Sequence, residues 1–137
     1  DARLVAQTLK YPAPDGNGDG QAYVVRPKAA AGPLPAVVVV HENRGLNPHI
    51  RDVARRLALE GYVAVAPDAL DPVGGYPGDE DKARALWSKL DDPLAREDMF
   101  AAARWARTLP GTNGRLGAVG FCWGGWVVNQ MATRVPE

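Results

Sequence analysis

The sequence contains a single cysteine, Cys122, among 137 residues. An intrachain disulfide is therefore impossible, and cysteine pairing carries no information about the redox compartment. Sixteen basic residues balance sixteen acidic ones, so the charge gives no reason to expect a nucleic-acid or anionic-membrane partner. Apolar runs such as residues 36–40 have the length of a strand and fall far short of the ~20 residues that span a bilayer. We therefore expect a soluble chain, in the cytoplasm or the periplasm, with no nucleic-acid or membrane partner.

The length and the order of the apolar segments predict one α/β domain. A chain of 137 residues is long enough for one hydrophobic core and too short for two domains. Three runs without polar alternation are typical of strands buried on both faces, and segments with helical spacing separate them. We expect a mostly parallel sheet with helices on both faces. The expected strands are residues 4–11, 21–26, 36–40, 62–66 and 115–121, and the expected helices are residues 47–60, 79–90, 93–109 and 124–134.

The strongest chemical signal is Gly120-Phe121-Cys122-Trp123-Gly124-Gly125, where the last predicted strand meets the last predicted helix. It has the spacing glycine, any residue, nucleophile, any residue, glycine, with cysteine as the nucleophile. Glycines on either side avoid a collision at such a tight, strained turn. The helix that begins there directs backbone N–H groups at the site, which favours a thiolate and an oxyanion. The alternatives are a buried structural cysteine and a dinucleotide-binding loop, whose glycine spacing does not fit.

A second candidate site is the segment His41-Glu42-Asn43-Arg44-Gly45, directly after a buried strand. The carboxyl ends of parallel strands meet at one edge of a sheet, so this loop and the elbow are expected to lie together. Glu42 could accept the thiol proton, or it could simply pair with Arg44. His41 is expected to be a hydrogen-bonded structural residue more readily than a base. His41 and His49 lack the neighbours of a zinc pattern, so no metal is expected.

In combination these motifs resemble the dienelactone hydrolase family of α/β-hydrolases. The resemblance covers residues 20–137 and includes residues 41–47, 52–58, 60–68 and the pair Leu86-Trp87. It implies an α/β-hydrolase fold and hydrolysis of ester or lactone bonds by a Cys-Asp-His triad without a metal or other cofactor. By this resemblance Cys122 matches the nucleophile and Glu42 matches the carboxylate that holds and activates the thiol. The backbone N–H groups of Trp123 and Asn43 match the oxyanion donors.

Two departures from the family pattern shape the expectation. In the family the triad Asp and His follow the elbow helix, so residues 1–137 are expected to be a single-domain, N-terminal portion that is incomplete at its C-terminal side. The founding enzymes also bind the substrate carboxylate with arginine, whereas Glu80 stands at the aligned position. Arg84, one turn along, and Tyr76, in the preceding loop, are candidate substrate contacts. We therefore expect a small-molecule ester or lactone substrate, not specifically a dienelactone.

The sequence leaves three hypotheses for function. The leading one is a hydrolase that forms a thioester acyl-enzyme at Cys122. Its Asp and His would come from a C-terminal fragment or second chain of the same enzyme, and this chain alone is expected to be inactive. The alternative is a non-catalytic α/β-hydrolase-like binding module or an inactive fragment. A redox-sensing thiol is the third, and it would need a resolving cysteine from elsewhere.

Overall fold

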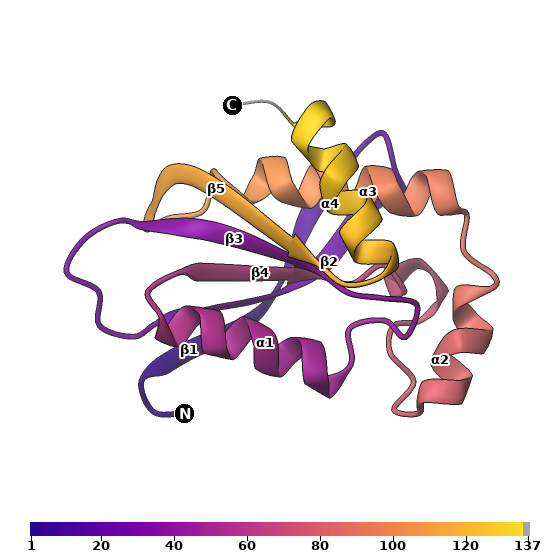
Figure 1. Cartoon of the computed structure of the whole chain (residues 1–137), viewed down its shortest axis with the longest axis horizontal. Helices are drawn as coiled ribbons and strands as arrows, with labels where there is room; N and C mark the ends of the chain where they lie inside the picture. Colours follow the sequence, from indigo (N-terminus) through magenta and orange to yellow (C-terminus); the bar gives the residue numbers. More distant parts are fainter. Residues whose placement is uncertain (136–137) are drawn as a thin grey trace.

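The computed structural model describes residues 1–135 and begins with a hairpin of two long strands (Figure 1). These strands, β1 (Leu4–Ala13) and β2 (Gly18–Pro27), pair antiparallel along their whole length. Gly18 has a φ of 95°, which glycine adopts without steric cost. The carboxylate of Asp98 anchors the turn by accepting hydrogen bonds from the backbone and side-chain nitrogens of Asn17. The predicted hairpin is confirmed, and both strands are longer than predicted.

The hairpin is part of a five-stranded sheet of order β1-β2-β4-β3-β5. β3 (Leu34–Val40), β4 (Val63–Pro67) and β5 (Thr112–Gly120) are parallel, and β2 pairs antiparallel with β4. Among the described strands, four of the five run in one direction and β2 alone runs opposite, so the predicted mostly parallel sheet is confirmed and only the two pairings of β2 are antiparallel. The reason is the N-terminal hairpin, because a short turn can join only antiparallel neighbours.

Helices cover both faces of the sheet, as the alternation of segments predicts (Figure 1). α1 (Pro48–Leu59) packs on one face, and its buried residues are Ile50, Ala54 and Ala58. α3 (Asp92–Ala106) and α4 (Trp123–Arg134) pack on the opposite face, in a separate apolar cluster that includes Phe100. Burial of one side chain such as Ile50 or Phe100 stabilises the fold by about 1.5–3 kcal/mol. The two clusters therefore hold the three layers together.

Side-chain caps determine where most helices begin. Asn47, Asp79 and Asp91 each accept a hydrogen bond from the backbone amide three residues later. Each cap satisfies an amide that the first helical turn leaves unpaired. α2 (Glu80–Trp87) accordingly follows Asp79, but it ends three residues before the predicted end at Leu90. The predicted loop 71–78 contains one short 3-10 helix, η1 (Asp71–Val73).

The register of the sheet brings the two candidate loops to neighbouring strand ends. Val40, the last residue of β3, pairs with Gly120, the last residue of β5. The loop that begins at His41 and the turn that contains Cys122 therefore start side by side. The sequence-based expectation that they meet at one edge is confirmed. Among residues 1–135, no helix has both the length and the apolar character that a membrane span requires.

Candidate active site

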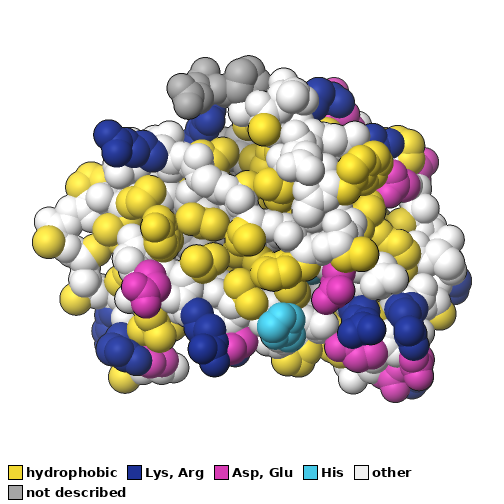
Figure 2. Space-filling view, viewed as in Figure 1, with side chains coloured by type: hydrophobic (Ala, Val, Ile, Leu, Met, Phe, Trp, Pro, Cys, Tyr) yellow, Lys and Arg dark blue, Asp and Glu magenta, His cyan; other side chains and the backbone are white. Residues whose placement is uncertain are grey.

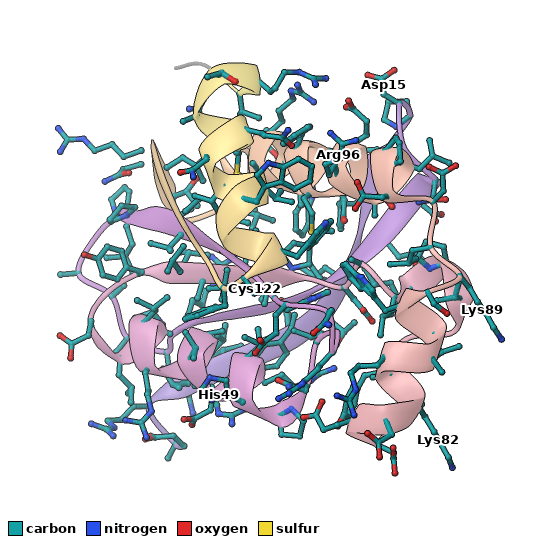
Figure 3. All side chains as sticks on the ribbon, turned by 45° about the vertical axis from the view of Figure 1, so that its right-hand side comes forward. Asp15, His49, Lys82, Lys89, Arg96 and Cys122 are labelled. Carbon is teal, nitrogen blue, oxygen red and sulfur yellow. The ribbon has the colours of Figure 1, made fainter. Side chains whose placement is uncertain are left out.

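Cys122 forms the turn between β5 and α4 in a conformation that few side chains tolerate. Its φ is 55° and its ψ is −113°, and no other non-glycine residue among those described has a positive φ. Backbone of this kind costs about 1–3 kcal/mol and persists only where the surroundings enforce it. The thiol is exposed at the start of α4 (Figure 3). The alternative of a buried structural cysteine is therefore wrong.

Two glycines allow the turn to pack against the end of β3. A Cβ atom on Gly120 would lie 2.1 Å from the carbonyl oxygen of Gly124, and a Cβ atom on Gly124 would lie 2.1 Å from that of Val40. Both obstacles are backbone atoms, which cannot turn aside as a flexible side chain can. The amide of Phe121 also donates a hydrogen bond of 3.2 Å to the carbonyl of Val40. These contacts enforce the strained geometry of Cys122, as the glycine pattern predicts.

The loop after β3 offers a carboxylate beside the elbow. Gly124 approaches its backbone so closely that an added Cβ atom would lie 2.8 Å from the carbonyl oxygen of His41. Glu42 is half-buried, and its carboxylate has no hydrogen bond or ion pair with any described residue. Arg44 is exposed and does not pair with it, so the ion-pair alternative for Glu42 is wrong. The carboxylate is thus available to a neighbouring polar group.

Two backbone N–H groups near the elbow are available to an anion. Among the hydrogen bonds of turns, loops and caps in residues 1–135, none is donated by the amide of Trp123 or of Asn43. The Trp123 amide belongs to the first residue of α4, where the helix leaves N–H groups unpaired and carries a partial positive charge. The two candidate oxyanion donors therefore lie on contacting segments with their hydrogens unpaired.

His41 is fully buried next to Glu42 and bridges two strand ends. Its Nε2 lies 2.9 Å from the backbone nitrogen of Ala69, and its Nδ1 lies 2.7 Å from the carbonyl oxygen of Glu42. An amide only donates and a carbonyl only accepts, so Nε2 must be unprotonated and Nδ1 must carry the hydrogen. Burial lowers the pKa of His41 to about 4, against a smaller opposing effect of the hydrogen bond to Glu42. His41 is therefore a neutral, hydrogen-bonded structural histidine, as the sequence analysis expects.

Three neighbours hold the side chain of Trp123. Its indole Nε1 donates a hydrogen bond of 2.8 Å to Oδ1 of Asp92, at the start of α3. Its ring packs edge-on against Trp87 of α2, with 4.7 Å between ring centroids, and stacks 6.3 Å from His41. Sequence reasoning missed Asp92, because it lies 31 positions from Trp123 and no local pattern marks the pair. These contacts fix the first residue of α4 and hence its backbone amide.

Known proteins that are similar to this chain identify its family. Residues 21–137 match the sequence model of the dienelactone hydrolase family. The chain belongs to the dienelactone hydrolase family. Its α/β-hydrolase fold is shared by the crystal structure of a "Putative Dienelactone Hydrolase" from Klebsiella pneumoniae subsp. pneumoniae, with a TM-score of 0.72 and 38% sequence identity. That likeness covers 93% of this chain and 55% of the Klebsiella chain.

Two curated relatives place the chain further within the dienelactone hydrolase family. A "Putative carboxymethylenebutenolidase" of Escherichia coli K12 is 40% identical over 142 residues, which cover 100% of this chain and 51% of that protein. The "Putative hydrolase fragment YghX" of the same organism is 56% identical over 91 residues, 66% of this chain and 78% of that protein. The chain thus spans about half the length of the carboxymethylenebutenolidase.

α2 carries Arg84, a predicted substrate contact, and Glu80, which stands where the family resemblance leads us to expect an arginine. Arg84 is exposed there and pairs with Asp81 of the same helix. Glu80, at the aligned position, accepts a hydrogen bond of 3.1 Å from Nδ2 of Asn47. α2 is therefore joined to the loop after β3 through Glu80 and to the elbow through Trp87, but no such contact reaches the elbow from Arg84.

Tyr76 lies half-buried in the loop before α2. Desolvation raises the pKa of its phenol, and the negative charges of Glu80 and Asp79 raise it further. Within the described chain no hydrogen bond or ring contact joins Tyr76 to the elbow. Its role as a substrate contact, like that of Arg84, stays a prediction. Among residues 1–135, no group of three or more His, Cys, Asp or Glu side chains is arranged to hold a metal ion.

Proposed function

We propose that this chain supplies the nucleophile of an ester or lactone hydrolase and that Cys122 is the attacking residue. The observation that carries the proposal is the enforced, strained backbone of Cys122, which presents an exposed thiol at the start of α4. Strain of this kind is concentrated at functional sites, where it preorganises a reacting group. Membership of the dienelactone hydrolase family supports the class of reaction.

The first half of the reaction makes a thioester. The Cys122 sulfur forms a bond to the acyl carbon, and the carbonyl electrons move to the oxygen. The amides of Trp123 and Asn43 donate to that oxyanion, and removal of one such donor typically costs about 10²–10³-fold in kcat. Collapse of the intermediate breaks the bond to the alcohol oxygen, which takes a proton from the triad histidine. In this scheme the triad histidine starts protonated, and Glu42 accepts the thiol proton as the substrate binds.

The second half of the reaction regenerates the thiol. Water attacks the thioester carbon while the triad histidine takes its proton, and the same two amides receive the second oxyanion. The bond to the Cys122 sulfur then breaks and releases the carboxylic acid, and the thiolate regains the proton that Glu42 accepted, while the histidine keeps the proton from water for the next cycle. No cofactor takes part in either half. The triad Asp and His of this proposal lie outside residues 1–137, so the chain alone is a poor catalyst.

The exposed edge at β5 supports the proposal that a companion segment brings the triad Asp and His. β5 is one of the two outer strands of the sheet, opposite β1, and hydrophobic side chains gather over it between α1 and α4 (Figure 2). Hollows flank the strand on both sides, an apolar one lined by Val53 and Leu57 from α1 and a mixed one lined by Val128 and Met131 from α4. An exposed apolar edge strand readily accepts a further strand. We therefore place the C-terminal fragment or second chain of the enzyme at this edge.

The proposed substrate is a small-molecule ester or lactone. Glu80 stands where the founding enzymes have an arginine for the substrate carboxylate, so an anionic dienelactone is disfavoured. Arg84 and Tyr76 remain the candidate contacts for the part of the substrate that reaches α2. A series of neutral and carboxylate-bearing esters, assayed on the complete enzyme, tests this selectivity directly. A preference for the carboxylate-bearing esters that Arg84→Ala removes would assign that role to Arg84.

The main experiment is an assay of the complete enzyme with p-nitrophenyl acetate and with a simple lactone. Cys122→Ala is expected to reduce kcat by at least about 10³-fold, because the nucleophile is lost. Ala132→Gly, in the last turn of α4, is the control substitution in the same helix that leaves the nucleophile in place. Unchanged activity in Cys122→Ala would show the proposed mechanism to be wrong. The intact mass of the native protein, with any co-purifying chain, tests the proposed companion.

The alternative, a non-catalytic module or inactive fragment, is favoured by one observation. The chain matches 78% of a relative whose name describes a hydrolase fragment. Iodoacetamide labelling followed by mass spectrometry separates the two functions. An activated Cys122 is expected to be alkylated well below neutral pH, whereas an unactivated thiol reacts slowly there. Absence of labelling at low pH, with normal labelling of the unfolded chain, would favour the non-catalytic function.

A further inference from the structure

The peptide unit between Glu42 and Asn43 is held from its carbonyl side. The Glu42 oxygen accepts a hydrogen bond from Nδ1 of His41 at 2.7 Å and another from the amide of Gly45 at 3.1 Å. A trans peptide is planar, and its C=O and N–H point in opposite directions. The Asn43 N–H therefore points away from His41 and Gly45, and it has no hydrogen-bond partner among the described residues.

We propose that His41 is a positioning residue that fixes the orientation of the Asn43 amide for the oxyanion by holding the Glu42 carbonyl of the same peptide unit. The inference rests on the proposed function, because it takes the Asn43 amide to be an oxyanion donor. His41 itself does not touch the reacting atoms. It affects the Asn43 amide only through the peptide unit between Glu42 and Asn43, whose orientation it fixes.

The hydrogen-bond partners of His41 allow only one tautomer of its ring. The amide of Ala69, two residues after the end of β4, requires an acceptor at Nε2, and the Glu42 carbonyl requires a donor at Nδ1. Only the neutral ring with its hydrogen on Nδ1 satisfies both. The ring is completely buried and packs against Trp87 and Trp123, each with its centroid 6.3 Å away. His41 thereby ties the ends of β3 and β4 to the peptide that carries the Asn43 amide.

The same geometry makes the Asn43 amide a stronger donor. Hydrogen bonds to a carbonyl polarise its peptide group, and in a low-dielectric interior the N–H of that group then donates more strongly. Preorganised donors contribute because they need not reorient when the oxyanion develops. Loss of the hydrogen bond from His41 leaves the peptide held by Gly45 alone. The expected consequence is a lower kcat with little change in KM.

The test compares His41→Leu and His41→Gln in the complete enzyme with p-nitrophenyl acetate. Leucine removes both hydrogen bonds, so kcat is expected to fall about 10–100-fold, less than for complete loss of an oxyanion donor. The glutamine side chain offers one acceptor and one donor, so it is expected to restore most of the lost kcat. Equal kcat in all three proteins would overturn the inference.

Two further readouts separate positioning from general damage. Alkylation of Cys122 by iodoacetamide forms no oxyanion, so its rate should be unchanged in both variants, whereas a merely structural defect would change it together with kcat. If His41→Leu does not fold, the kcat of His41→Gln and the ¹⁵N chemical shifts of the wild-type histidine still test the inference. These shifts report which ring nitrogen carries the hydrogen. A hydrogen on Nε2 in place of Nδ1 would overturn the inference. The proposed function is tested separately, because its failure requires an active Cys122→Ala enzyme.

Discussion

The indole Nε1 of Trp123 donates a hydrogen bond of 2.8 Å to Oδ1 of Asp92, and this contact ties the first residue of α4 to the first turn of α3. The other carboxylate oxygen of Asp92 pairs with Nε of Arg96 at 2.9 Å. Arg96 in turn lies over the ring of Trp126, 5.0 Å from its centroid. One carboxylate thus links both tryptophans of the elbow helix to α3.

Asp92→Leu is expected to lower the free energy of unfolding by about 1–3 kcal/mol, because the indole N–H loses its acceptor. Asp92→Asn should lose less, since an amide oxygen can still accept from Trp123. Arg96→Gln removes a half-exposed ion pair and the contact with the Trp126 ring but leaves the indole hydrogen bond in place, so it should cost about 1 kcal/mol. Urea unfolding of the three variants measures the differences. Equal losses in Asp92→Asn and Asp92→Leu would contradict the role of the indole hydrogen bond.

Gly124 and Gly125 are adjacent but differ in what an added methyl group would meet. A Cβ atom on Gly124 would lie 2.1 Å from the backbone oxygen of Val40, whereas one on Gly125 would lie 3.4 Å from that of Gly120. Gly124→Ala is therefore expected to lower the free energy of unfolding by more than about 2 kcal/mol. Gly125→Ala is the matched control and should be neutral or stabilising, since alanine favours the helix. Chemical denaturation compares the two, and similar stabilities would contradict the close packing.

The fold and the elbow could be predicted because their signals are local. The turn residues before Gly18, the unbroken run 36–40 and the glycines around Cys122 each constrain their own segment of backbone. Alternation of such segments then leaves few topologies. The neighbour of β2 could not be predicted in this way, because the order of the strands along the chain does not reveal that β2 pairs with β4.

The contacts that support the site could not be predicted in the same way. His41 reaches Ala69 across 28 positions, and Asp92 reaches Trp123 across 31. Such pairs depend on how α2, α3 and the strand ends pack in three dimensions, and neither residue belongs to a spacing pattern. Arg84 was predicted from its place one turn after Glu80, and Tyr76 from its place in the preceding loop, so both roles depend on substrate contacts that the fold of this chain does not determine.

The buried, neutral state of His41 predicts a loss of stability in acid. Burial lowers the pKa of His41 to about 4 in the folded chain, whereas the ordinary value is 6.5. The unfolded chain therefore binds the proton more tightly between these values. The stabilising contribution is fully present above pH 6.5 and is lost as the pH falls toward about 4. The loss amounts to about 3 kcal/mol at most, from 1.4 kcal/mol per pKa unit.

Urea unfolding at pH 7.5 and 4.5 measures this effect of His41. His41→Gln cannot titrate in this range, so its free energy of unfolding should fall less than that of the wild type between the two pH values. The difference between the two proteins isolates His41 from the other titrating groups. An identical fall in both would exclude His41 as the source.

Asp68, which follows β4, has the opposite pH dependence. Burial raises its pKa from 3.8 to about 6, and the nearby Asp71 adds to the shift, while the hydrogen bond from the Leu70 amide and the charge of Arg51 oppose it. The folded state favours the protonated carboxyl, so this contribution is fully present below pH 3.8 and is lost as the pH rises through about 6. Asp68→Asn keeps an acceptor for the Leu70 amide without the charge.

The expected result is a gain of about 1–3 kcal/mol in the free energy of unfolding of Asp68→Asn at pH 7.5. At a pH near 4 the gain should vanish, because the wild-type carboxyl is then protonated in the folded state. Thermal unfolding at the two pH values provides the measurement. A gain of the same size at both would mean that the charge of Asp68 is not its cause.

The strain at Cys122 predicts an inverted order of stability between glycine and alanine. In a regular helix alanine is more stable than glycine by about 1 kcal/mol. Ala132→Gly, at an exposed position of α4, should show that order. At Cys122 the φ of 55° penalises any side chain with a Cβ atom, and glycine escapes the penalty. The free energy of unfolding of Cys122→Gly should therefore equal that of Cys122→Ala or exceed it by about 1 kcal/mol. If Cys122→Gly were instead less stable by as much as Ala132→Gly, the elbow would not be strained, and the observation on which Cys122 was proposed as the nucleophile would be lost.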